Sequence, residues 1–175
     1  MFMLQQIVLH TPWFVWGILA LCIVMGVRQL HDQRQSRLRL MAVPAIWTAF
    51  GLWGMTSAFG LQPQTLAAWA LGLGLVVAGL SQFAWPRGVR FDGATGLFHV
   101  PGSWVPMAMI MGIFMAKYIV GVSLAMAPQL AQLAPFGLGV SLLYGALSGL
   151  FIARANSVLR HGRAAVGGRA TTLSL

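Results

Sequence analysis

The chain has 175 residues, of which 58% are hydrophobic and only 7% charged, and its formal net charge is +9. Soluble domains average about 25% charged residues, so this chain cannot cover a water-facing surface, and an ordinary soluble enzyme is excluded. Lipid must be the solvent for much of it. The single cysteine, Cys22, lies in an apolar run, which excludes an internal disulfide and a cysteine-pair zinc site. We expect it to act as a small buried apolar residue.

Five apolar stretches approach the ~20 residues that a helix needs to cross a bilayer. They cover residues 7–27, 40–60, 66–85, 104–126 and 136–153. The segment before the first stretch has no Lys or Arg, and no small-residue cleavage pattern follows it, so we expect an anchor and not a cleaved signal peptide. The sequence therefore predicts an all-α membrane protein, a bundle of about five transmembrane helices.

Every arginine falls in alternate connections of this five-helix path. The first loop, the third loop and the tail hold them all: Arg28, Arg34, Arg37, Arg39, Arg87, Arg90, Arg154, Arg160, Arg163 and Arg169. Because short cytoplasmic loops are enriched in Lys and Arg, the N-terminus is predicted to be periplasmic and the C-terminus cytoplasmic. The same placement argues against nucleic-acid binding and predicts contact with anionic lipid at the cytoplasmic face.

The third loop carries the pattern of a short β-hairpin. Residues 89–100 read VRFDGATGLFHV, with apolar residues on both sides of a turn rich in Asp and Gly. An isolated hairpin is marginally stable in water, so we expect this cytoplasmic hairpin to lean on the membrane surface or on the first loop. Residues 154–175 lack a sustained apolar period and are expected to form a basic, mostly mobile cytoplasmic tail.

Lys117 is the only charged side chain inside an expected span. Charge at that depth costs at least ~2.5 kcal/mol and marks a candidate site. Lys117 lies roughly 20 Å from the inner end of its helix. Counting along the other helices places four further polar or aromatic side chains at a similar depth: Tyr144, Ser141, Thr56 and Trp53. Three hypotheses stay open for Lys117: packing with no chemical role, binding of an anionic group, and proton relay.

Small residues recur every four positions along the fifth stretch. The row consists of Gly137, Ser141, Gly145 and Gly149. Such rows allow membrane helices to approach closely. The row is expected to pack within one subunit, and a homodimer is the alternative.

No nucleophile–base pair, paired carboxylate, phosphate loop or metal-ligand spacing occurs in the sequence. Asp32 and Asp92 are the only acidic residues, which leaves few groups for acid–base catalysis. We therefore predict no enzyme activity, no metal and no cofactor. The leading hypothesis is an accessory, assembly or scaffold component of a membrane complex. The alternative is a small, oligomeric transporter or channel-like protein with an anion or substrate site at Lys117.

Two segments carry a resemblance to known proteins. Residues 100–106 (VPGSWVP) and 114–121 (FMAKYIVG) resemble a family of small, uncharacterised bacterial inner-membrane proteins. The layout also resembles, more distantly, the CcdC-like proteins associated with cytochrome c biogenesis. The first resemblance implies a bacterial plasma membrane and no assigned activity. The second implies an accessory role, although the chain has no CxxC motif for a thiol-transfer step of its own.

Overall fold

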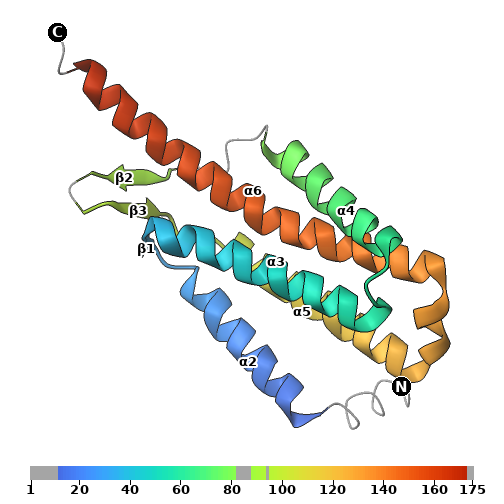
Figure 1. Ribbon diagram of the computed structural model, residues 1–175. Coiled ribbons are helices and arrows are strands. Elements are labelled where there is room, and N and C mark those ends of the chain that lie inside the picture. The colour runs from blue at the N-terminus through green and yellow to red at the C-terminus, as the bar shows by residue number, and fades with distance from the viewer. Residues whose placement is uncertain (1–11, 82–87, 94, 173–175) are drawn as a thin grey trace.

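The computed structural model describes the backbone of residues 12–81, 88–93 and 95–172, with side chains as far as residue 160 (Figure 1). Most of it is helical. The elements are α2 (Trp13–Arg28), β1 (Gln33–Gln35), α3 (Arg37–Phe59), α4 (Pro63–Ser81), β2 (Arg90–Asp92), β3 (Leu97–Val100), α5 (Val105–Met126), the 3-10 helix η1 (Pro128–Gln132) and α6 (Ala134–Thr172).

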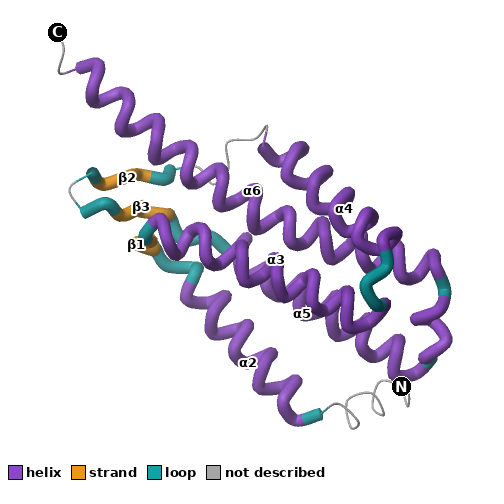
Figure 2. The backbone as a smooth tube through the Cα atoms, viewed as in Figure 1, coloured by secondary structure: helices purple, strands orange, loops and turns teal. Residues whose placement is uncertain are grey.

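Helix α6 is the long central element of the bundle. It lies against α4 and α3 over most of their lengths and continues past them beside the strands (Figures 1 and 2). Helix α2 packs on α5 instead. Three buried clusters join the helices. One centres on Cys22 and Ile110, a second on Met55 and Tyr144, and a third on Phe98 beneath the strands.

The strands form a three-stranded antiparallel sheet at one end of the bundle, in the order β1-β3-β2 (Figure 2). We call this end the sheet end. The β2–β3 turn is closed by the Gly96 amide, which donates to the Asp92 carbonyl at 2.8 Å, and Gly96 has a φ of +68°. Phe98 is 1% exposed and packs with Val158 of α6, so the sheet adds its own small core to the bundle.

The first loop contributes the third strand and is tied to the start of α5. Gln33, Arg34 and Gln35 pair with Val100, His99 and Phe98, in that order. Next to this pairing, the Asp32 carboxylate accepts a hydrogen bond from the Gly102 amide at 2.8 Å, and the Ser103 amide donates to the Gln29 carbonyl at 2.9 Å. Two strands pair within the predicted hairpin segment, and β1 of the first loop adds a third strand to them. The cytoplasmic placement of this hairpin stays a prediction.

Four helices, α3 to α6, are long and apolar enough to cross a membrane. These helices confirm the prediction of a mostly helical, multi-pass membrane protein. Helix α2 is apolar but has 16 residues, so its role as a further span stays a prediction. Residues 7–11 and 82–85 of the expected first and third spans lie outside the described residues.

The last helix differs from its expected bounds. The sequence pattern placed its end at residue 153, whereas α6 continues to Thr172. The cause is tertiary packing: Ala155 and Val158 are buried, and Val158 packs with the sheet core that Phe98 anchors. As far as Val158, a stretch without its own apolar period is therefore helical beside a sheet that buries one side of it.

Candidate functional site

The Lys117 ammonium lies among aromatic rings between α3, α5 and α6. Its Nζ atom is 4.4 Å from the centre of the Phe50 ring and 4.7 Å from the centre of the Tyr144 ring. It also donates to the Phe50 carbonyl at 3.4 Å, a long hydrogen bond. Ring faces attract a cation most strongly where water is excluded. The two rings therefore compensate part of the cost of burying this charge.

A glycine in α3 makes room for this approach. A Cβ atom on Gly54 would collide with Lys117 Nζ and lie 3.8 Å from the Tyr144 ring. Gly54 and Phe50 are four residues apart, so they lie on the same face of α3. The absence of a side chain at position 54 therefore leaves room for the lysine in the position where it meets the α3 backbone.

The structure brings together two of the five residues that were expected to form the site, Lys117 and Tyr144. The other three turn to their own helices. Ser141 is fully buried and donates to the Gly137 carbonyl at 2.7 Å. Thr56 donates to the carbonyls of its own helix turn, each at 3.1 Å. Trp53 points outward and is 65% exposed. The residues that contact the Lys117 ammonium from α3 are Phe50 and Gly54, which the matching of depths did not identify.

An apolar cleft of about 740 Å³ runs beside the lysine, between α2, α3 and α5. Its α3 wall consists of Ile46, Trp47 and Phe50, and its floor follows α5 from Ile110 to Met126. Phe50 belongs both to the ring cage around the ammonium and to the wall of this cleft. Among the described residues that line it, Lys117 is the only charged one.

The small-residue row of α6 faces neighbouring helices of the same chain. A Cβ atom on Gly145 would collide with the Trp69 backbone of α4, and one on Gly149 would lie 2.8 Å from the Leu73 carbonyl oxygen. Gly137 faces Phe59 of α3, and Ser141 lies fully buried between these positions. The α4–α6 packing is therefore backbone against backbone.

A family model covers residues 1–168 of the chain and is described as a family of unknown function, DUF6622. The chain belongs to this family. No curated protein and no solved structure matches it. The family agrees with the part of the sequence resemblance that pointed to uncharacterised proteins.

In this DUF6622 chain, the groups near Lys117 limit what the site can bind. Its only carboxylate side chains, Asp32 and Asp92, both lie at the sheet end, so Lys117 has no acidic side chain beside it. Within the part of the chain that the structure describes, no three His, Cys, Asp or Glu side chains gather as metal ligands. The site is a cation with spare hydrogen-bond donors next to an apolar cleft.

Proposed function

We propose that this chain is a non-enzymatic, multi-pass protein of a bacterial inner membrane that binds an anionic group at Lys117, as a small transporter or channel-like protein would. The observation that supports this proposal is the incomplete hydrogen bonding of the Lys117 ammonium. An ammonium has three N–H donors, and among the described residues a single backbone carbonyl, that of Phe50 at 3.4 Å, accepts from it. An anion entering beside Phe50 would satisfy the remaining donors and neutralise the charge.

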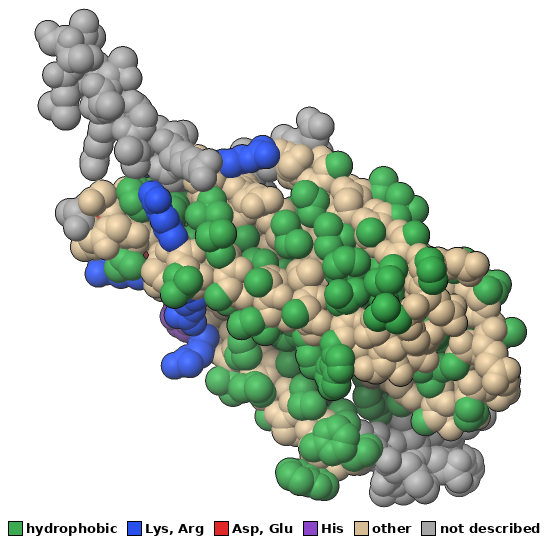
Figure 3. All heavy atoms as spheres, viewed as in Figure 1, with side chains coloured by type: hydrophobic (Ala, Val, Ile, Leu, Met, Phe, Trp, Pro, Cys, Tyr) green, Lys and Arg blue, Asp and Glu red, His purple; other side chains and the backbone are tan. Residues whose placement is uncertain are grey.

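The distribution of arginines supports an orientation with the N-terminus periplasmic and the C-terminus cytoplasmic. In the face that Figure 3 presents, the blue Lys and Arg side chains gather toward the sheet end, and the described part of the opposite end shows green and tan spheres without blue ones. Arg34 and Arg90 lie on strands of the sheet, and Arg37 begins α3 with its guanidinium 5.3 Å from the centre of the Phe91 ring. Basic residues at one end suit a cytoplasmic face with anionic lipid.

An accessory or assembly role, like that of the CcdC-like proteins, is the second candidate. The sheet favours it, because β1 and β2 are edge strands with no further strand beside them among the described residues. Exposed strand edges are templates for pairing with another chain. This role needs a protein partner or a second copy, and it does not need Lys117.

One experiment distinguishes the anion-binding function from the assembly function. It compares two lipophilic ions of the same shape and opposite charge. Wild-type protein in phosphatidylcholine nanodiscs is titrated with tetraphenylborate, an anion, or tetraphenylphosphonium, a cation. We expect tetraphenylborate at ten times its Kd to raise the melting temperature by roughly 3–6 °C and the cation to have no effect. Lys117→Met should abolish the rise.

The control variant is Thr56→Val, which keeps Lys117 and removes a hydroxyl that bonds only within its own helix. It should respond to tetraphenylborate as the wild type does. Equal shifts with both ions, or an undiminished shift in a folded Lys117→Met protein, would refute anion binding at Lys117. A partner that co-purifies at fixed stoichiometry would then support the assembly role.

A further inference from the structure

We infer that the Lys117 site takes a lipophilic anion, a single-chain amphiphile with one anionic head, and that this ligand enters sideways from the bilayer between α2 and α3. The inference rests on the proposed anion binding at Lys117 and adds the class of ligand and its route. Three observations carry it: the shape of the cleft, the side on which it opens, and the charge of its lining.

The cleft has the shape of a trough along α5. Its floor extends from Ile110 to Met126, which corresponds to roughly 24 Å of helix, and Lys117 lies near the middle of this length. Its volume of about 740 Å³ is within the range of small-molecule sites, roughly 300–1,000 Å³. With the head at Lys117, roughly 10–14 Å of trough extends to either end, which is room for part of an extended hydrocarbon chain, whereas a small inorganic anion would leave most of the trough empty.

The open side of the trough faces lipid. Helices α2 and α3 diverge from the sheet end, so that the far ends of the pair stand apart (Figures 1 and 2). Helix α2 is held to α5 at its inner half, where a Cβ atom on Gly26 would lie 2.7 Å from the Met107 side chain. The lining residues Leu21 of α2 and Ile46 of α3 are 58% and 66% exposed. Leu21 and Ile46 are apolar, and α3 is long and apolar enough to cross a membrane, so we take the bilayer as the phase that the trough opens to.

The residues that line the trough favour a ligand with one negative charge and an otherwise apolar structure. Lys117 supplies the one cation, and the remaining lining residues are almost all aliphatic or aromatic, among them Trp47, Phe114 and Tyr118. A water-soluble anion would have to lose its hydration against these walls, and a ligand with several charges would find one partner. A carboxylate, with its single charge, has the required head chemistry, whereas a phosphate monoester carries about −1.5 to −2 at pH 7 and would leave part of its charge unpaired.

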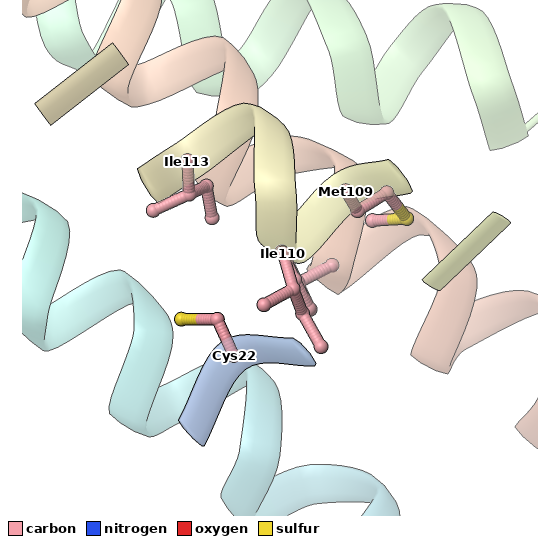
Figure 4. Close-up of a cluster of buried hydrophobic side chains, with 5 residues drawn as sticks. Cys22, Met109, Ile110 and Ile113 are labelled. Atoms are coloured by element: carbon pink, nitrogen blue, oxygen red, sulfur yellow. The ribbon is translucent and has the colours of Figure 1, made fainter. Parts of the chain in front are cut away.

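Cys22 offers a reporter inside the cleft. It is the only cysteine, it lines the trough, and it is 6% exposed. Figure 4 shows its side chain on α2 in the cluster with Ile110 and Ile113 of α5. A ligand that occupies the trough therefore covers the only thiol in the protein, and no cysteine has to be introduced.

The experiment measures modification of Cys22 by the lipid-soluble reagent N-cyclohexylmaleimide in phosphatidylcholine nanodiscs. Oleate should slow the reaction at least fivefold in the wild type, whereas methyl oleate and acetate should leave the rate unchanged. Dodecyl phosphate is the arm that compares head groups: it should protect Cys22 more weakly than oleate does, because its head carries more than one charge. Protection by dodecyl phosphate that equals or exceeds protection by oleate would overturn the choice of a singly charged head. Native mass spectrometry counts bound oleate in the same samples and decides if the thiol proves unreactive.

Two variants complete the test. Lys117→Met should lose protection by oleate, and Ile46→Trp, which fills the trough and keeps the lysine, should lose it as well. Equal protection by methyl oleate, or protection by acetate, would overturn the inference. If tetraphenylborate binds through Lys117 while oleate neither protects Cys22 nor appears in the mass spectrum, the ligand class fails and the anion site stands.

Discussion

Helix α4 lies so close to α6 that backbone meets backbone, whereas α2 diverges from α3 and leaves a trough that side chains line but do not fill. On the first side, Gly72 of α4 and Gly145 of α6 each face the backbone of the other helix. On the second side, the lining residues Leu21 of α2 and Ile46 of α3 are 58% and 66% exposed. Both sides use glycine-containing apolar helices of similar composition.

The contrast between the two sides shows which helix contacts stabilise this bundle. Lipid tails are as apolar as leucine, so burial of apolar surface does not drive membrane helices together. Close van der Waals contact does, and it needs small residues on the facing sides of both helices. The α4–α6 pair meets this condition, and the α2–α3 pair does not. The tight side therefore carries stability, and the loose side is free to hold a ligand.

The largest expected effect is on the tight side. In Gly72→Leu, the new side chain would begin 3.1 Å from the backbone nitrogen of Ala146, and the helices would have to separate. We expect a loss of about 3 kcal/mol or more, seen as a fall in melting temperature of roughly 6–12 °C. The matched control is Gly74→Leu on the same helix, where nothing lies within 4 Å of the Cβ position. A similar fall in both variants would contradict the importance of close backbone contact.

A smaller effect is expected at the point where the lysine meets the trough. A double-mutant cycle with Phe50→Leu and Lys117→Met should give a coupling energy of about 1–2 kcal/mol, because a desolvated ammonium over a ring is worth that much. Thermal unfolding of the four proteins measures it. The same cycle with Phe136→Leu should be additive within about 0.5 kcal/mol, since the Phe136 ring packs on Phe59. Coupling of equal size in both cycles would show that Lys117 acts on stability generally and not through Phe50.

The four helices long enough to cross a membrane, and the pairing of β2 with β3, could be predicted from the sequence because their signals are local. Apolar length predicts a membrane helix, and the Asp–Gly turn between apolar residues predicts paired strands. β1 was not accessible, since Gln33-Arg34-Gln35 has no apolar alternation and is a strand only because β3 lies beside it. The extension of α6 was missed for the same reason, because contact with the sheet is what buries Val158.

The candidate site could be predicted from the sequence only in part. Counting residues gives depth, and depth brought Tyr144 to the level of Lys117. Rotation about each helix decides which side chains meet, and depth carries no information on it. Ser141, at a matching depth, bonds within its own helix, whereas Phe50 meets the lysine with both its ring and its carbonyl. Gly54 was the available signal, since a glycine near an intramembrane charge marks a place where a long side chain can approach the backbone.

The smallest expected effect is on the wall of the trough. Ile46 is 66% exposed, and Met55, nine residues along the same helix, is fully buried. In Met55→Ala a cavity replaces packed atoms, and the expected loss is about 2–5 kcal/mol. In Ile46→Ala lipid takes the place of the lost methyl groups, so unfolding should change by less than about 0.5 kcal/mol. Thermal unfolding of both variants in nanodiscs makes the comparison. If Ile46→Ala cost as much as Met55→Ala, the trough wall would be packed core, and the two sides of the bundle would no longer differ in kind. A negligible loss of stability in Ile46→Ala, together with weaker protection of Cys22 by oleate, would mean that Ile46 contributes to ligand binding in the trough and not to the stability of the fold.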